Sequence, residues 1–307
     1  MPPLPLGEGG GEGWPAATLP NQMLTLLFDG IAYGMLLFVL AVGLAVTLGL
    51  MNFINLAHGA FAMAGGYITV LLMNRFGVPF LACLPLAFAG SALIGAVLEP
   101  LLYRRMYGRP HLDQVLFSIG LVFMAVTAVD FLLGGVQQNV QLPAYLRGRF
   151  DIEWIGIGKY RLFIIVVCGA LTLALQWVLS RTRFGSQLRA SVDDPRVAGG
   201  LGLNVNRIFL LTFAMGSGLA GLGGALGAEV LGLDPTFPLK FMIYFLIVCS
   251  VGGTTTITGP LLAALLLGIA DVAGKYYVPK LGAFIVYTLM IVILLVRPQG
   301  LFARAGK

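Results

Sequence analysis

Between Met23 and Asn74 the chain carries one formal charge, Asp29. A bilayer core about 30 Å thick needs about 20 apolar residues per helix, so this stretch is long enough for two crossings. Further apolar segments follow at roughly 79–102, 113–134, 161–180, 207–231, 240–274 and 282–296. Because unpaired backbone groups are not tolerated in lipid, such segments must be helical. The sequence predicts an all-α integral membrane protein, a polytopic bundle of about eight to nine transmembrane helices.

Composition supports a membrane protein. Hydrophobic residues make up 58% of the chain and charged residues only 10%, whereas soluble domains are about one quarter charged. The net charge of +6 could indicate a protein that binds nucleic acid. The basic residues lie in loops without a long basic run, however, which is typical of the cytoplasmic loops of membrane proteins. We therefore expect the lipid bilayer as a partner and no nucleic acid.

The basic loops also predict sidedness. Arginines gather at 104–109 and 181–207, and Arg297, Arg304 and Lys307 form a third basic group. With the N-terminus outside, all three groups fall on the cytoplasmic side, and the long loop 135–160 falls outside. The C-terminus is then cytoplasmic.

Two interruptions of the apolar pattern divide the chain into comparable parts. Polar, glycine-marked breaks occur at Asn52–Gly59 and at Gly252–Gly259, on either side of the loop 135–160. Paired interruptions in corresponding halves are typical of transport pathways. We expect broken or re-entrant helices in two weakly related halves. Segment 240–274 is either two short spans or a re-entrant pair.

The stretch from Arg181 to Arg207 is a compact polar loop, with 5 Arg and 2 Asp between two apolar segments. Phe184 and Leu188 are four residues apart and share a helix face. Asp194-Pro195 is typical of a helix start, since the carboxylate accepts from free amides and proline suits the first position. The glycines at 199, 200 and 202 end that helix within about two turns. The alternative is a solvated connector held at the membrane surface by arginine.

The run RASVDDPRVAGGLGLNVNR, followed by TFAMGSGLAGLGGAL, resembles the cytoplasmic loop of permease subunits of branched-chain amino acid ABC importers, the LivH type. In that family the loop docks into the ATPase subunit and transmits its movement. The resemblance implies the same for residues 184–203. The implied coupling residues are Phe184, Leu188, Arg189, Asp193, Asp194, Pro195, Arg196, Val197, Ala198, Leu201 and Gly202.

Two further segments are similar to the same family. LMNFINLAHGAFAMAGGY (50–67) and VGGTTTITGPLLAALLLG (251–268) resemble its two glycine-marked breaks, and the ending RPQGLF (297–302) also matches, so the resemblance spans 50–302. Polar groups at such breaks face protein or water. The candidate path residues are Asn52, Asn55, His58, Thr254, Thr255, Thr256 and Thr258. The alternatives are a structural, hydrogen-bonded histidine and threonine hydroxyls bonded to nearby carbonyls.

Two groups of residues inside the apolar segments remain. Gly216, Ala220, Gly224 and Ala228 form a small-residue stripe, for close helix packing within the chain or for an interface with a second permease. The acids Asp130, Glu229 and Asp271 lie near the ends of apolar segments, where we expect them to be hydrated at the external interface.

The resemblance leads to a functional hypothesis. We expect a membrane-spanning permease subunit of an ATP-driven ABC importer for branched-chain amino acids or a related small polar solute (urea, an amide or an aromatic acid). No GxxxxGK[ST] motif occurs, so no cofactor is expected in this chain, and ATP and Mg would act through partner subunits. The expected partners are a second homologous permease, two cytoplasmic ATPases and a periplasmic binding protein. The alternative is an ion-gradient-driven secondary transporter; we expect no enzyme, because GxSxG and HExxH are absent.

These expectations give a domain organisation for a protein of the bacterial inner membrane. Residues 1–22 are expected to be a disordered periplasmic tail rich in proline and glycine. Residues 23–302 are the transmembrane permease domain, with the cytoplasmic coupling loop at 181–207. Residues 303–307 are a cytoplasmic tail.

Overall fold

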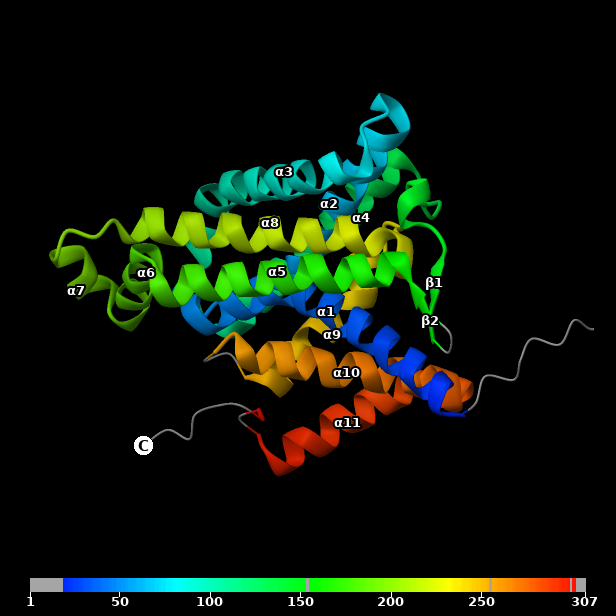
Figure 1. Ribbon diagram of the computed structural model, residues 1–307. Helices are drawn as coiled ribbons and strands as arrows, with labels where there is room; N and C mark the ends of the chain where they lie inside the picture. The colour runs from blue at the N-terminus through cyan, green and yellow to red at the C-terminus, as the bar shows by residue number, and fades with distance from the viewer. Residues whose placement is uncertain (1–18, 153–154, 254–255, 299, 302–307) are drawn as a thin grey trace, which may run out of the picture.

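The computed structural model describes residues 19–301, with gaps at 153–154, 254–255 and 299 (Figure 1). It is a helical bundle. The helices are α1 (Leu19–Met51), α2 (His58–Phe76), α3 (Phe80–Leu101), α4 (His111–Leu133), α5 (Lys159–Arg181), α6 (Arg183–Asp193), α7 (Pro195–Gly200), α8 (Val205–Leu231), α9 (Phe237–Gly252), α10 (Thr258–Tyr277) and α11 (Gly282–Val296). Short 3₁₀ turns lie at Tyr103–Met106, Ala144–Leu146 and Pro279–Leu281.

The prediction of an all-α membrane fold is confirmed. Within the described residues, six helices are long and apolar enough to cross a membrane: α1, α3, α4, α5, α8 and α10. The helices α9 and α11 are apolar but shorter. The expected count of eight to nine crossings depends on these two and on α2, and it stays a prediction, as do the re-entrant helices and the related halves.

One element was not foreseen. The connection between α4 and α5 contains a two-stranded antiparallel hairpin, β1 (Arg149–Ile152) paired with β2 (Ile155–Gly158), in which Phe150 lies opposite Ile157. Such a hairpin satisfies its backbone groups within the loop, so the connection keeps a defined shape outside the bundle.

Helix α8 occupies the centre of the bundle, packed against α1, α2 and α3. Its glycines bring backbones together: a Cβ on Gly224 would clash with the carbonyl of Ala62, and one on Gly65 with the backbone of Gly221. The whole stripe Gly216, Ala220, Gly224 and Ala228 is buried within the chain. Close packing inside the subunit is therefore its role, and an interface with a second permease is not.

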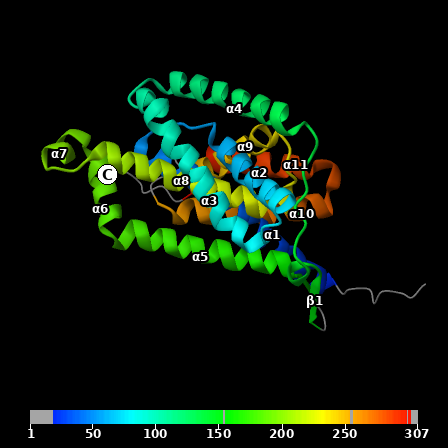
Figure 2. The same ribbon diagram turned by 90° about the horizontal axis from the view of Figure 1, so that it is seen from above.

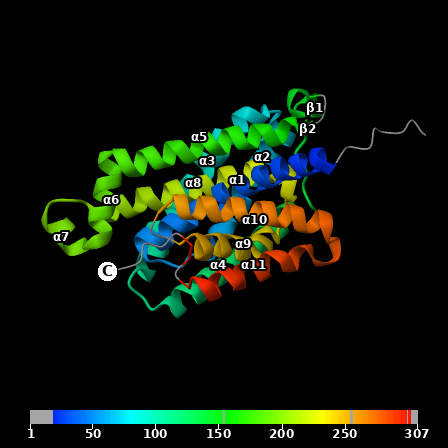
Figure 3. The same cartoon turned by 60° about the horizontal axis from the view of Figure 1, so that its bottom comes forward.

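The bundle has two distinct ends (Figures 1 and 2). The start of α1 and the β-hairpin lie at one end, which we call the hairpin end. The α3–α4 connection, the helices α6 and α7, and the end of α11 lie at the other, which we call the coupling end. The basic segments 104–109 and 181–207 thus share one end with Arg297, whereas Arg304 and Lys307 lie outside the described residues. Figure 3 shows α9, α10 and α11 side by side on one flank.

The acids inside the bundle differ from expectation in one case. Asp130 and Glu229 are exposed, but Asp271 is buried and its Oδ2 lies 2.5 Å from Lys275 Nζ. The two residues are one helical turn apart on α10, so the half-exposed lysine is the charge partner of the buried carboxylate. Hydration of Asp271 was therefore a wrong expectation.

Candidate functional site

The polar loop between α5 and α8 folds into two helices with defined starts. Asp194 Oδ1 accepts hydrogen bonds from the amides of Arg196 (2.8 Å) and Val197 (3.0 Å), with Pro195 at the first helical position. The predicted start of α7 is confirmed, and it ends at Gly200 as the glycines indicated. Two caps were missed: Thr182 caps α6 and Asn204 caps α8. Threonine and asparagine are both common N-cap residues, so the sequence contained the signal for each helix start.

Helix α6 is fastened to the end of α5. Leu188 is fully buried and Phe184 packs against the core from the same face, as their spacing predicts. Gly185 lies so close to Leu179 that a Cβ would clash with the Leu179 carbonyl. Arg189 Nη1 donates to the same carbonyl at 2.5 Å. A displacement of α6 must therefore move the end of α5.

Helix α7 presents an apolar surface outward. Ala198 is buried, whereas Val197 is 58% exposed and Leu201 80% exposed. Gly202 follows with φ of +87°, a conformation that glycine adopts without strain. Among the remaining coupling residues, Asp193 and Arg196 are also exposed. The tip of the coupling end thus combines apolar and charged side chains on a short capped helix.

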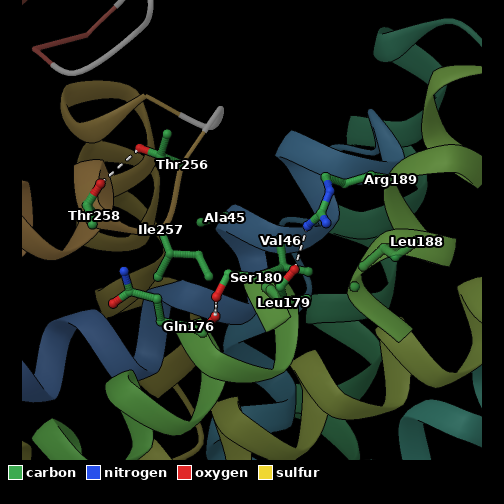
Figure 4. A pocket seen from close by; sticks show the side chains of 11 residues that line it. Ala45, Val46, Gln176, Leu179, Ser180, Leu188, Arg189, Thr256, Ile257 and Thr258 are labelled. Carbon is green, nitrogen blue, oxygen red and sulfur yellow. Dashed lines mark hydrogen bonds between the residues drawn. The ribbon is translucent and has the colours of Figure 1, made fainter. Parts of the chain in front are cut away.

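A cavity of about 360 Å³ lies directly behind α6 (Figure 4). Four segments enclose it: the last turns of α1, the end of α5, α6, and the residues leading into α10. The lining residues are Ala45, Val46, Gln176, Leu179, Ser180, Gly185, Leu188, Arg189, Thr256, Ile257 and Thr258. The cavity therefore brings two predicted coupling residues, Leu188 and Arg189, together with two predicted path residues, Thr256 and Thr258.

The second break, between α9 and α10, forms one wall of this cavity. Thr258 Oγ1 and Thr256 Oγ1 are 3.3 Å apart, and Thr256 Oγ1 accepts from the Gly259 amide at 3.3 Å. Both threonine side chains are exposed, and their hydroxyls bond to each other and to an amide rather than to carbonyls. Thr254 and Thr255 lie outside the described residues.

The first break, between α1 and α2, does not line the cavity. Asn52 is exposed and has φ of +49°. Asn55 is buried, and its Oδ1 has no hydrogen-bond partner within the described residues. His58 is buried, its Nε2 donates to the Leu40 carbonyl at 3.0 Å, and its ring meets Phe245 edge-on. The predicted path residues are thus divided between two places, and the contacts of His58 favour the structural alternative.

A cluster at the α3–α4 connection clamps the first break. Phe53 lies edge-on between Tyr103 and Tyr107, at centroid distances of 5.7 and 5.5 Å. The Ile54 amide donates to Gln114 Oε1 at 3.0 Å. These contacts hold the break against the α3–α4 connection and the first turn of α4, which sequence reasoning missed.

A buried ion pair supports the clamp. Glu99, at the end of α3, is fully buried, and Arg104 donates to both of its carboxylate oxygens, at 3.2 and 2.6 Å. Burial and the nearby Glu99 carboxylate raise the pKa of Tyr107 well above its ordinary value. An acid inside an apolar segment, followed five residues later by arginine, was the available sequence signal.

Comparison with known proteins decides among the functional hypotheses. The family described as "Branched-chain amino acid transport system / permease component" matches residues 26–294. The chain belongs to this family. Membership rules out the secondary-transporter alternative and identifies the chain as a multi-pass membrane permease subunit, as the resemblance implied.

Individual relatives align over nearly the whole chain. The high-affinity branched-chain amino acid transport system permease protein BraD of Pseudomonas aeruginosa is 28% identical, covering 92% of this chain and 96% of the relative. LivH of Escherichia coli is 26% identical with the same coverage. LivM of Salmonella typhimurium is 28% identical over 87% of this chain and 68% of the relative. No solved structure matches the chain.

Proposed function

We propose that this chain is the membrane-spanning permease subunit of an ATP-driven ABC importer that moves branched-chain amino acids or a related small polar solute. The observation that carries this proposal is the cavity that coupling and path residues share. Family membership and the names of the relatives support the substrate class.

The coupling end faces the cytoplasm in this proposal, because its basic segments follow the distribution of cytoplasmic loops. The N-terminus is then periplasmic and the C-terminus cytoplasmic. The helices α2, α9 and α11 cross the membrane as well. Similarity to both LivH and LivM fits pairing with a second, homologous permease. Two ATPases bind at the coupling end, with ATP and Mg, and a binding protein delivers substrate at the hairpin end.

The exposed face of α7 and the adjoining charges form the contact with an ATPase in this mechanism. When ATP draws the ATPases together, they push on α7 and α6. Because Gly185 lets α6 lie against the Leu179 carbonyl and Arg189 donates to that carbonyl, the push moves the end of α5 and changes the cavity between α6 and the second break. Transport is then a shift between two states of the bundle, driven by differential contact with the ATPases.

The path runs past Thr256 and Thr258, with Thr254 and Thr255 in the same segment. Asn52, Asn55 and His58 shape the first break beside it. The described lining offers hydroxyl and amide groups and the Arg189 guanidinium among apolar side chains, which suits a zwitterionic solute.

The first experiment is purification of this chain co-expressed with candidate ATPases, followed by an assay of ATP hydrolysis with and without a leucine-loaded binding protein. We expect stable co-purification and stimulated hydrolysis. The combined change Asp194→Ala and Pro195→Gly removes the cap and the rigid first turn of α7, so it should abolish stimulated hydrolysis while membrane insertion stays intact. Normal transport by that double variant would contradict the coupling role.

A further inference from the structure

The cavity at the coupling end has an uneven distribution of charge. Arg189 is the only charged residue among its 11 described lining residues, and none of them is acidic. A guanidinium carries five N–H donors in a planar fork. One donates to the Leu179 carbonyl, which leaves donors to spare beside the cavity. The site therefore favours a negatively charged group over a cation.

The opposite wall of the cavity also favours a negatively charged group. The helix α10 begins at Thr258 and runs for 20 residues. The first amides of a helix carry a partial positive charge. Thr256 and Thr258 add hydroxyls at this wall, and Figure 4 shows them across the cavity from Arg189.

Most of the remaining lining is apolar. Ala45 and Val46 come from α1, Leu179 from α5, Leu188 from α6 and Ile257 from the second break. A volume of about 360 Å³ is at the small end of ligand pockets. A bare inorganic anion would leave these apolar walls without contact, whereas a small aliphatic carboxylate covers them.

We infer that the cavity is a binding site for an aliphatic α-amino acid, with Arg189 as the residue that binds its carboxylate. The branched side chain contacts Val46 and Ile257. The ammonium group donates to the oxygens of Gln176, Thr256 or Thr258. This inference rests on the proposed function, and it adds a site on the permease itself to the one that a binding protein would supply. Because Arg189 also joins α6 to α5, binding of the amino acid is linked to the position of α6.

Equilibrium binding of radiolabelled leucine to the purified permease–ATPase complex, in neutral detergent and without binding protein, tests the inference. We expect saturable binding that Arg189→Gln weakens at least tenfold, because a charge-assisted pair is lost. Arg183→Gln is the matched control: Arg183 is exposed on the same helix but does not line the cavity, so binding should be unchanged. Ile257→Trp fills the cavity from the opposite wall and should block leucine binding while Arg189 is intact. This variant tests the site even if the Arg189 variant fails to assemble with the ATPases.

Two analogues of leucine separate its charged groups. We expect 4-methylpentanoate, which keeps only the carboxylate, to compete with leucine, and 3-methylbutylamine, which keeps only the amine, not to compete. Competition by the amine alone would overturn the assignment, as would unchanged binding by Arg189→Gln. Leucine uptake into proteoliposomes with binding protein is measured in parallel. Uptake without binding to the isolated complex would overturn this inference alone, whereas failure of both uptake and stimulated hydrolysis would overturn the proposed function.

Discussion

The two breaks in the helical pattern look alike in sequence and differ in structure. Both are short, polar and marked by glycine, and both open on a residue with positive φ, Asn52 in the first and Gly253 in the second. The first is enclosed by an aromatic cluster and tied to α4 through Gln114. The second borders a cavity and exposes Thr256 and Thr258.

The difference indicates that the two breaks have different mechanical roles. The first break is fixed, because moving it would uncover Phe53 and leave the Ile54 amide without its acceptor. A break with exposed hydroxyls beside a cavity changes shape at lower cost. We therefore assign rigidity to the first break and movement to the second. Four substitutions test this contrast, in order of decreasing effect.

Phe53→Ala should have the largest effect on stability. The side chain is fully buried between Tyr103 and Tyr107, and removing a buried phenylalanine costs about 3–5 kcal/mol. Unfolding of the purified protein in detergent measures the loss. Phe131→Ala is the control, because Phe131 is 87% exposed on α4 and should change stability by less than about 0.5 kcal/mol. Equal losses for the two variants would refute the clamp.

Gly253→Ala should follow. Gly253 has φ of 74° and ψ of 160°, a region that is open almost only to glycine, so a side chain there costs about 1–3 kcal/mol. Asn52 has φ of 49°, in the range that asparagine tolerates, and Asn52→Gly should be close to neutral. The same unfolding assay compares them. A Gly253→Ala variant as stable as the wild type would show that the end of α9 does not require the backbone conformation of Gly253.

Gln114→Leu removes the acceptor for the Ile54 amide. A partly buried amide left unpaired costs about 1 kcal/mol, the low end of the usual range. Amide hydrogen exchange in segment 52–57 provides a local readout, and exchange should accelerate there while α8 stays protected. Gln114→Glu keeps an acceptor and should preserve protection, so acceleration in both variants would argue against the hydrogen bond.

Thr256→Ala should change stability least and function most. Its hydroxyl is exposed and its bond to the Gly259 amide is 3.3 Å long, so the loss should stay below about 0.5 kcal/mol. We expect leucine uptake to fall severalfold, because the hydroxyl lines the cavity. Thr256→Ser keeps the hydroxyl and should retain uptake. Full uptake by the alanine variant would show that the transport path does not run past Thr256.

The sequence predicted best what depends on neighbours along the chain. Asp194 and Pro195 define the start of α7 because capping involves only the next three residues, and the apolar segments identified the membrane helices from length alone. The burial of Asp271 was missed, although Lys275 stands one turn away and was visible in the sequence.

The cavity could not be predicted, because it depends on how distant helices pack. Arg189 and Thr256 belong to different motifs, and only the placement of α6 against α5 and of α10 beside α1 brings them to one space. For the same reason the sequence could not say that His58 would bond to the Leu40 carbonyl, or that Phe53 would lie between Tyr103 and Tyr107.

The glycine packing of α8 bears on the order in which the protein is assembled in the membrane. The mean hydropathy of α8 is 1.6, against 2.2 to 2.4 for α1, α3, α4 and α5, since much of its surface is bare backbone that gains little from lipid. Its main partners, α1, α2 and α3, all precede it in the chain. The helices α1, α2 and α3 are therefore synthesised before α8, which packs between them. If α8 were synthesised ahead of α2, its glycine surface would face lipid until α2 and α3 had been inserted.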